Sequence, residues 1–249
     1  MKPAHDPGVR WGGALLLAGA VAMLAGAAVH FSDPALGIDG AIERGEISGY
    51  LGNVVQIKGK AYVNLVLWIV GVGLLGLGGT ALSAAGDASR AAARGVVRFA
   101  YAAGATLAWV SFMVWIALVR AAPTLEPSVA ESFAFIASRI DWLATTLIVG
   151  IGPAVLSRMM GIEWLPKWLR AWGLLAAGAS VLTWIAMAAG GLESYGFIVV
   201  PVGVLWSLAT GILAWRRAAS QMSTRTSVQL AASPIQMSTA RKLAGHSPQ

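Results

Sequence analysis

Few residues in the apolar stretches of this chain could do chemistry, and those that could lie at matching ends of those stretches. His30 and Asp33 follow the first stretch, Arg139 and Asp141 open the fourth, and Glu193 separates the fifth from the sixth. Ionisable groups are costly inside a bilayer and usually mark a functional site. We therefore take these five residues as a candidate polar cluster, whose acids could bind a small molecule or act as general acids on a lipidic substrate.

A second polar feature continues from Asp141 along the fourth stretch. Ser138, Asp141 and Thr145 recur at steps of three and four residues, which places them on one face of a helix. A polar face within a membrane is expected to point into the bundle and away from lipid. Pro153 in the same stretch and Pro201 in the sixth weaken their helices, and broken helices beside a polar face can line a substrate path.

Each of these residues also has a structural interpretation. Ser138, three residues ahead of Asp141, fits a helix-capping pair. Arg139 could extend its head to the lipid headgroups, and His30 could form an ordinary hydrogen bond at the membrane interface. Proline kinks are common in membrane helices that have no transport role. The sequence leaves both interpretations open for the cluster.

Metal and cofactor chemistry has little support in the composition. The chain has no cysteine, which excludes disulfides, thiolate nucleophiles and iron–sulfur clusters. Only one of its three histidines, His30, adjoins an apolar stretch, so a haem held by two histidines of one chain is excluded. His30 and the nearby carboxylates match no established metal spacing, and there is no phosphate-binding glycine loop. We expect neither a metal nor a cofactor.

The elements that must position these residues are membrane-spanning helices. Charged residues make up only 12% of the 249 residues, where a soluble domain carries about 25%. A helix needs roughly 20 apolar residues to cross a bilayer. Stretches of that length run near 11–31, 61–83, 96–119, 138–157, 171–190 and 196–215. The fold class predicted is therefore all-α, a polytopic bundle of six transmembrane helices whose main partner is the lipid bilayer.

The basic residues predict the orientation of the bundle. With six spans both termini share one side, and that side receives thirteen of the eighteen Lys and Arg residues. The other side receives Arg44, Lys58, Lys60, Arg120 and Arg139. Cytoplasmic loops carry the excess of positive charge, so both termini are expected in the cytoplasm. This distribution explains the net charge of +7 by topology, and we expect no nucleic-acid partner.

Three connections carry further predictions. The alternation of apolar and small residues in 32–60 indicates a short amphipathic helix at the outer surface. Ser128 and Glu131 resemble a capping box, so the helical path into the fourth span would begin well before the membrane. Trp164, Trp168 and Trp172 recur every four residues, which predicts one helical stripe at the headgroup level.

Small residues predict where helices come closest. The second span is rich in glycine, and seams of small residues occur in the first and sixth spans. These seams are Ala18, Ala22 and Gly26 in the first span, and Gly203, Ser207 and Gly211 in the sixth. In lipid, such positions let helix backbones approach one another.

The chain divides into three regions. Residues 1–10 form a short cytoplasmic N-terminus, 11–217 the six-helix transmembrane domain, and 218–249 a cytoplasmic tail rich in Ser, Thr, Gln and Ala. The tail has no apolar periodicity, which predicts disorder. The oligomeric state is left open by these patterns.

The second half of the chain carries a family resemblance. The residues that carry it are Gly150-Ile151-Gly152, Leu156-Ser157-Arg158, the linker from Trp164 to Leu174, and the Pro201–Trp215 helix ending in Arg216-Arg217. The first half matches more loosely, through Arg10-Trp11-Gly12-Gly13 and the acidic loop with Asn53. This pattern resembles an uncharacterised family of six-helix bacterial integral membrane proteins, known as a domain of unknown function. The resemblance implies six helices and supplies no activity, cofactor or site residue.

We interpret the chain as a non-enzymatic integral membrane protein that binds or passes a small molecule. Two alternatives remain. A small transporter or permease subunit would use the kinked fourth and sixth helices and the Asp141 face, along a continuous polar path. A membrane-embedded enzyme acting on a lipidic or terpenoid substrate would use the acids of the cluster, in a cavity open on one side only.

Overall fold

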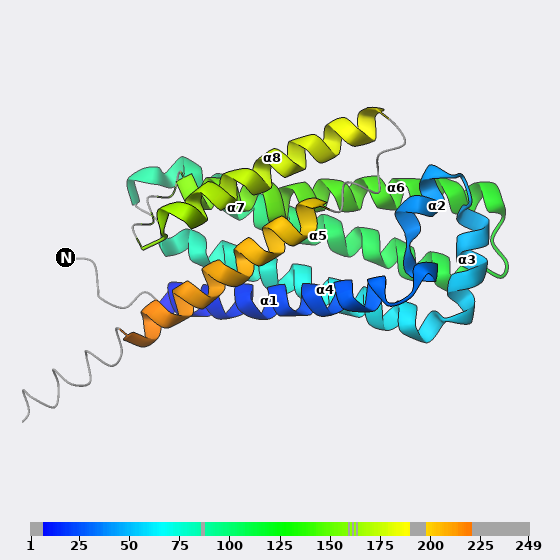
Figure 1. Ribbon diagram of the computed structural model, residues 1–249, viewed down its shortest axis with the longest axis horizontal. Coiled ribbons are helices and arrows are strands. Elements are labelled where there is room, and N and C mark those ends of the chain that lie inside the picture. Colours follow the sequence, from blue (N-terminus) through cyan, green and yellow to red (C-terminus); the bar gives the residue numbers. More distant parts are fainter. Residues whose placement is uncertain are drawn as a thin grey trace, which may run out of the picture.

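The computed structural model describes residues 7–85, 88–158, 160, 162, 164–189 and 198–220. The side chains of Asp39 and Glu43 are among those left undescribed. Within these ranges the chain is helical and has no strand, and its long helices run side by side as one elongated bundle (Figure 1). The first and last described helices begin and end at the same end of the bundle, here called the terminal end (Figure 1). The predicted all-α class is confirmed.

Six helices are long and apolar enough to cross a membrane. They are α1 (Pro7–Phe31), α4 (Lys58–Leu82), α5 (Ala91–Ala121), the path of α6 and α7 (Pro127–Arg158), α8 (Lys167–Ala189) and a last helix, Val199–Ser220. At 1.5 Å per residue the 31 residues of α5 reach about 46 Å, well beyond a hydrocarbon core of about 30 Å. The count of six spans is therefore confirmed, while α5 and α6 extend past the predicted apolar windows.

The fourth span begins eleven residues before the window predicted for it. α6 (Pro127–Thr145) has Glu126 as its N-cap and proline in its first turn, where a missing N–H costs nothing. The capping box predicted for Ser128 and Glu131 is wrong, because Ser128 lies inside the helix and its hydroxyl donates to Glu126 (2.8 Å). The capping alternative for Ser138 is also wrong, since that residue lies well within α6.

Three short helices close the opposite end of the bundle, here called the capped end (Figure 1). They are η1 (Pro34–Leu36), α2 (Ile38–Glu43) and α3 (Ile47–Gln56). α3 buries Ile47, Leu51 and Val54 and exposes Ser48 and Gly52, so the predicted amphipathic helix is confirmed. Gly45 makes the turn between α2 and α3 at φ 66°, a backbone conformation that favours glycine.

The terminal half of the bundle is held together by glycines. A Cβ on Gly78 of α4 would lie 2.7 Å from the backbone nitrogen of Leu16, and one on Gly19 of α1 would lie 2.8 Å from that of Leu75. On another face of α4, Gly76 lies against Ala105 and Gly79 against the ring of Tyr101. The glycine-rich helix therefore lets α1 and α5 approach its backbone on two sides, as predicted.

The last helix uses the small residues predicted for it. Gly203 lies directly against Val149 in the fourth span, and a Cβ on Gly211 would lie 2.8 Å from the carbonyl oxygen of Gly13 in α1. The seam predicted in the first span is wrong for Ala18, which is exposed, whereas Gly26 is buried against Trp68 of α4. Helix α1 also meets α4 through Gly12 and Gly19, which are seven residues apart and on one face.

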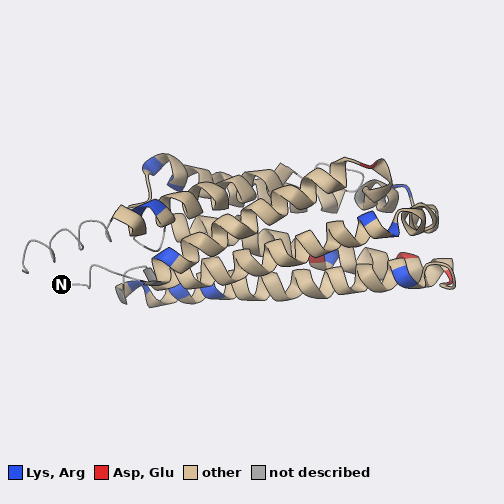
Figure 2. Cartoon of the chain, turned by 90° about the horizontal axis from the view of Figure 1, so that it is seen from below, with Lys and Arg blue, Asp and Glu red and all other residues tan. Residues whose placement is uncertain are grey.

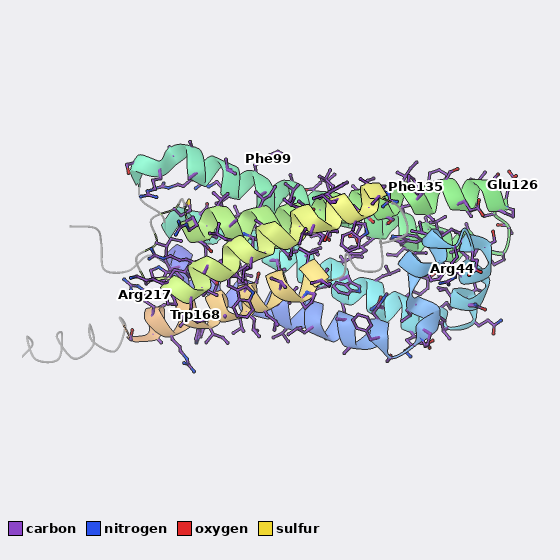
Figure 3. The ribbon with its side chains drawn as sticks, turned by 45° about the horizontal axis from the view of Figure 1, so that its top comes forward. Arg44, Phe99, Glu126, Phe135, Trp168 and Arg217 are labelled. Carbon is purple, nitrogen blue, oxygen red and sulfur yellow. The ribbon has the colours of Figure 1, made fainter. Side chains whose placement is uncertain are left out.

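Aromatic side chains mark the surface of the bundle. Phe99 and Phe135 point away from it (Figure 3) and are exposed, as expected for a surface that lies in lipid. Trp168 and Trp172 neighbour one another on α8, with ring centroids 6.1 Å apart. Trp164 precedes the start of α8 at Lys167, so the prediction of one helical stripe of three indoles is wrong for that member.

Most of the described charges lie at one end of the bundle or the other (Figure 2). Those at the terminal end are Arg10, Arg90, Arg94, Arg98, Arg158, Lys167, Arg170, Arg216 and Arg217. The capped end holds Arg44, Lys58, Lys60 and Arg120 together with the described acids of the loops, among them Asp33, Glu46 and Glu126. Arg44 and Glu126 lie near the capped end and Arg217 near the terminal end (Figure 3).

Candidate functional site

The capped half of the bundle encloses a cavity of about 110 Å³. Its walls come from α1, α4, α5 and α6, its roof from the capping helices, and Val200 reaches it from the last helix. The polar lining residues are His30, Asn64, Ser138, Asp141 and Thr145. The aromatic ones are Tyr50, Trp68, Phe112, Trp115 and Trp142. A few polar groups in a mostly apolar and aromatic wall are typical of a small-molecule site.

The helical spacing of the fourth span places three polar side chains in this wall. Ser138, Asp141 and Thr145 all line the cavity from α6, one above the other. Their steps of three and four residues bring side chains to one face of a helix, about 5–6 Å apart at Cβ. This face points into the bundle, as its polarity predicted.

Ser138 differs from the other two residues of this face, because its buried hydroxyl has no hydrogen-bond partner among the described residues. The residue is only 4% exposed. The same residue type at position 132 of α6 donates to the carbonyl oxygen four residues earlier (2.9 Å). A buried hydroxyl without a partner costs free energy, so this residue, which lines a cavity, is a candidate contact for an ordered water or a ligand.

Asn64 is a cavity residue that the sequence analysis missed. It lies on α4, is buried, and donates from Nδ2 to the carbonyl oxygen of Gly26 on α1 (2.7 Å). Because that carbonyl can only accept, the bond fixes the orientation of the amide and leaves Oδ1 as its acceptor. The signal in the sequence was a lone amide within a 25-residue apolar helix.

Neither family models, nor curated proteins, nor solved structures gave a match to this chain. The assignment of a function therefore rests on the geometry of the site.

The aromatic wall is ordered by contacts of its own. Tyr50 from α3 meets Trp115 from α5 edge to face, with ring centroids 6.4 Å apart. This pair joins the cap to α5 at the cavity wall. Such an edge-to-face pair contributes about 0.5–1.5 kcal/mol beyond the area it buries, so it helps to hold the roof in place.

A π-helical segment, Thr146–Ile151, forms part of the cavity wall. Ile148 and Val149 from this segment line the cavity, and Pro153 follows it. Proline has no N–H to donate and clashes with the preceding turn, so the widened turn just ahead of it relieves that clash. Single π turns recur at functional sites in membrane and soluble helices alike.

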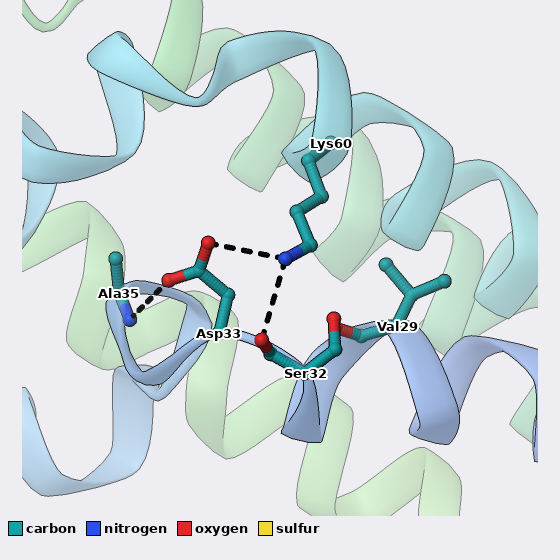
Figure 4. A network of polar contacts seen from close by, with 5 residues as sticks. All are labelled: Val29, Ser32, Asp33, Ala35 and Lys60. Atoms are coloured by element: carbon teal, nitrogen blue, oxygen red, sulfur yellow. Dashed lines mark hydrogen bonds and ion pairs between the residues drawn. The ribbon is translucent and has the colours of Figure 1, made fainter.

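Asp33 lies outside the cavity, where it joins two helix ends (Figure 4). Its carboxylate accepts from the ammonium of Lys60 (3.1 Å) and from the amide of Ala35 (3.1 Å). The Ala35 amide first, and then Lys60, hold the pKa of Asp33 below its ordinary value. The same ammonium also donates to the carbonyl oxygen of Ser32 (3.4 Å). This arrangement caps η1 and fastens the end of α1 to the start of α4.

Two other members of the predicted cluster lie elsewhere. The guanidinium of Arg139 lies over the ring of Phe135 on the same helix (4.4 Å) and donates to Sδ of Met187 on α8 (3.2 Å). Glu193 lies outside the described residues. The structure therefore brings His30, Asp141, Ser138 and Thr145 to one cavity, and places Asp33 and Arg139 in separate contacts.

No group of three or more His, Asp or Glu side chains within the described ranges is arranged to hold a metal ion. Among the described residues, the cavity wall offers polar side chains from α1, α4 and α6, including one carboxylate, and several aromatic faces. Such a set can orient and desolvate a small ligand.

Proposed function

We propose that this protein binds a small molecule, or the head of a larger amphiphile, in the cavity at the capped end of its bundle. The observation that carries the proposal is the unpartnered Ser138 hydroxyl, which shares one cavity wall with Asp141. An engineered apolar cavity of about 150 Å³ is large enough to bind benzene, so a cavity near 110 Å³ suits a ligand of a few heavy atoms.

The ligand reaches the cavity from the capped side in this proposal. Support comes from the terminal half, where α4 meets α1 and α5 through glycines, and the fully buried Tyr101 of α5 packs against Gly79 of α4 and Gly152 of α7. Close-packed helices of this kind leave few voids larger than a water molecule. The capped side also carries the short helices and loops, which move at a lower cost than spanning helices.

We further propose that the protein lies in a bacterial plasma membrane with both termini in the cytoplasm. The excess of Lys and Arg at the terminal end supports this orientation. Membership of the uncharacterised six-helix family also stays a proposal. Its support is the set of residues in the second half of the chain that resembles that family.

A transporter is the second candidate, and the π segment with Pro153 is the observation that favours it. A substrate passing through the bundle would have to leave the cavity beside this segment and pass Tyr101. Ser157 lies beyond that point, buried and with its hydroxyl unpartnered within the described residues. Access to Ser157 therefore distinguishes a path from a closed cavity.

Because the chain has no cysteine, single-cysteine variants test both proposals without background labelling. Cysteines at Ser48 and Ser128 are expected to react with an impermeant maleimide in intact spheroplasts, and a cysteine at Ser89 only after lysis. Cysteine at Ser138 is expected to react with a small methanethiosulfonate added from outside. The matched control is Ser111, which is fully buried, donates to the Ala137 carbonyl oxygen (2.8 Å) and lies outside the cavity wall.

The outcomes separate the candidates. Modification at Ser138 with protection at Ser111 and Ser157 supports a binding cavity reached from the capped side. Modification at Ser157 from either side supports a transport path. Equal protection at Ser138 and Ser111 refutes the accessible cavity, and labelling of Ser89 in intact spheroplasts refutes the orientation.

A further inference from the structure

We propose that the place where α1 meets the last helix, at the terminal end of the bundle, binds the headgroup of an anionic phospholipid. This surface, here called the terminal junction, consists of Arg10 and Trp11 from α1 and of Trp215, Arg216 and Arg217 from the last helix. It lies at the opposite end of the bundle from the cavity, so the inference goes beyond the proposed function and does not depend on it.

Close backbone contact holds the two helices together at this junction. A Cβ on Gly13 of α1 would lie 2.7 Å from Cβ of Ala214 and 3.1 Å from the backbone nitrogen of Trp215. Three residues before Gly13, the guanidinium of Arg10 lies over the indole ring of Trp215, with Cζ 5.3 Å from the ring centroid. The cation at the start of α1 and those that follow Trp215 are therefore presented by two helices in contact.

The junction lies at the level of the lipid headgroups. The last helix has 22 residues and is about 33 Å long, slightly more than a hydrocarbon core of about 30 Å. Arg216 and Arg217 lie near the end of this helix, so their guanidiniums reach beyond the hydrocarbon. Trp11 is 65% exposed and Trp215 40% exposed, and indoles at a surface of this kind favour the interface between lipid and water.

The charge of the junction favours an anion. The described residues of the terminal end include no Asp or Glu, and Arg216 and Arg217 are both exposed. In the sequence, this side of the spans carries thirteen Lys and Arg residues against three acids, Asp6, Asp87 and Glu163. A guanidinium presents several N–H donors in one plane and binds phosphate oxygens through two parallel hydrogen bonds.

The apolar surroundings favour a lipid over a soluble phosphate. Trp11 and Trp215 place exposed indole surface beside the guanidiniums, and this surface can contact the glycerol and the first acyl carbons of a lipid. Clusters of Lys and Arg next to the cytoplasmic end of a spanning helix attract anionic lipids, and each cation raises the affinity about fivefold. In the proposed orientation the junction faces the cytoplasmic leaflet, where such lipids gather.

The experiment measures which lipid the full-length protein retains, by native mass spectrometry from detergent micelles. The micelles contain equal amounts of phosphatidylglycerol and phosphatidylcholine with the same acyl chains. We expect a preference for phosphatidylglycerol of about tenfold or more, because two exposed cations act on one phosphate. Glycerol 3-phosphate in excess, which supplies the phosphate without acyl chains, is expected not to displace the lipid.

A double variant assigns the preference to the junction. Arg216→Gln with Arg217→Gln removes two charges from an exposed surface, and we expect it to abolish the preference for phosphatidylglycerol. The matched control is Lys58→Gln with Arg120→Gln, which removes the same charge from exposed residues at the capped end and should keep the preference. Circular dichroism and size exclusion verify that each variant is folded.

Each other result overturns the inference. Equal retention of the two lipids shows that there is no anionic-lipid site. A preference that survives the double variant, or one that the control loses equally, shows that the junction does not provide it. Displacement by glycerol 3-phosphate shows that the site takes a soluble phosphate. None of these results bears on the labelling of a cysteine at Ser138, which tests the binding cavity separately.

Discussion

The two halves of the bundle use the same helices for opposite purposes. In the terminal half, α1, α4 and α5 meet through glycine and alanine, and the space between them is filled by buried side chains such as Leu16, Leu75 and Tyr101. In the capped half, the same three helices carry large aromatic residues and a few polar ones around a cavity of about 110 Å³. The size of the side chains along each helix therefore decides which half is closed and which is hollow.

This difference has a physical basis in membrane packing. Lipid gives helices little hydrophobic reason to associate, so they are held by close contact of their backbones and by hydrogen bonds between them. Glycines supply the close contact in the terminal half. Bulky rings keep the helices apart in the capped half, where Asn64 and Ser111 provide hydrogen bonds across helices instead. A rigid half and a hollow half can thus be built on continuous helices.

Enlarging a glycine of the terminal half should have the largest effect, because it tests whether contacts between helix backbones hold that half together. Gly78→Ala should lower the free energy of unfolding by about 2–3 kcal/mol, at the upper end of overpacking effects. The obstacles to the new methyl are backbone atoms, at 2.7 Å for Leu16 N and 2.9 Å for Gly12 O, which cannot rotate away. The measurement is equilibrium unfolding by SDS titration in mixed micelles.

Gly95 in α5 provides the matched control, because a Cβ there meets nothing within 4 Å. Gly95→Ala should leave stability unchanged or raise it by about 0.5–1 kcal/mol, the ordinary helix preference for alanine. Equal effects at the two glycines would show that backbone contact does not hold the terminal half together.

A second substitution pair compares the halves at one helix. Ala108→Leu fills part of the cavity and should change the free energy of unfolding by no more than about 1 kcal/mol, whereas Ala105→Leu, opposite Gly76, should cost about 1–3 kcal/mol. The two residues lie one turn apart on α5 and both are buried. A large loss at both positions would mean that the cavity does not accept added volume.

The smallest expected effect concerns the junction between α1 and α4 at the capped end. Asp33→Asn keeps the bond from the Ala35 amide but loses the charge that faces Lys60, so it should lower the thermal unfolding temperature slightly at pH 7. Because the pKa of Asp33 is lowered on folding, its charge stabilises the fold above its ordinary pKa of 3.8 and ceases to do so as pH falls further.

The difference between Asp33→Asn and the unchanged protein should therefore narrow as the pH is lowered below 4. Glu46→Gln serves as the control, since Glu46 pairs with Arg44 at the exposed surface of the cap (2.6 Å). Exposed pairs contribute little to stability. A difference that widens on acidification would contradict the assignment of the effect to the Asp33 charge.

Local patterns predicted the framework well. The six spans follow from apolar length, and the close approach of the last helix follows from Gly203 and Gly211. The inward direction of Ser138, Asp141 and Thr145 follows from helical periodicity alone. The predictions failed where they depended on how a helix begins. Ser128 and Ser138 have the spacing of caps, but Pro127 starts the helix ahead of both.

The composition of the site could not be predicted from spacing along the chain. Asp33, Arg139 and His30 all flank spans at one end of the bundle, and nothing in their sequence positions separates them. In the structure His30 lines the cavity, Asp33 pairs with Lys60, and Arg139 contacts α8. Which of several neighbours a side chain meets depends on the rotation of its helix, and that rotation is set by the glycine contacts of other helices.

The all-α class, the six spans and the polar face of the fourth helix follow from the amino-acid sequence, because each depends on residues within one helix length. The packing of the helices brings this face together with Asn64, His30 and the rings of Trp68 and Trp115 around one cavity. These residues lie on separate helices, and lipid imposes no order among helices beyond their insertion. Their meeting depends on contacts between backbones far apart in the chain, which no local pattern encodes.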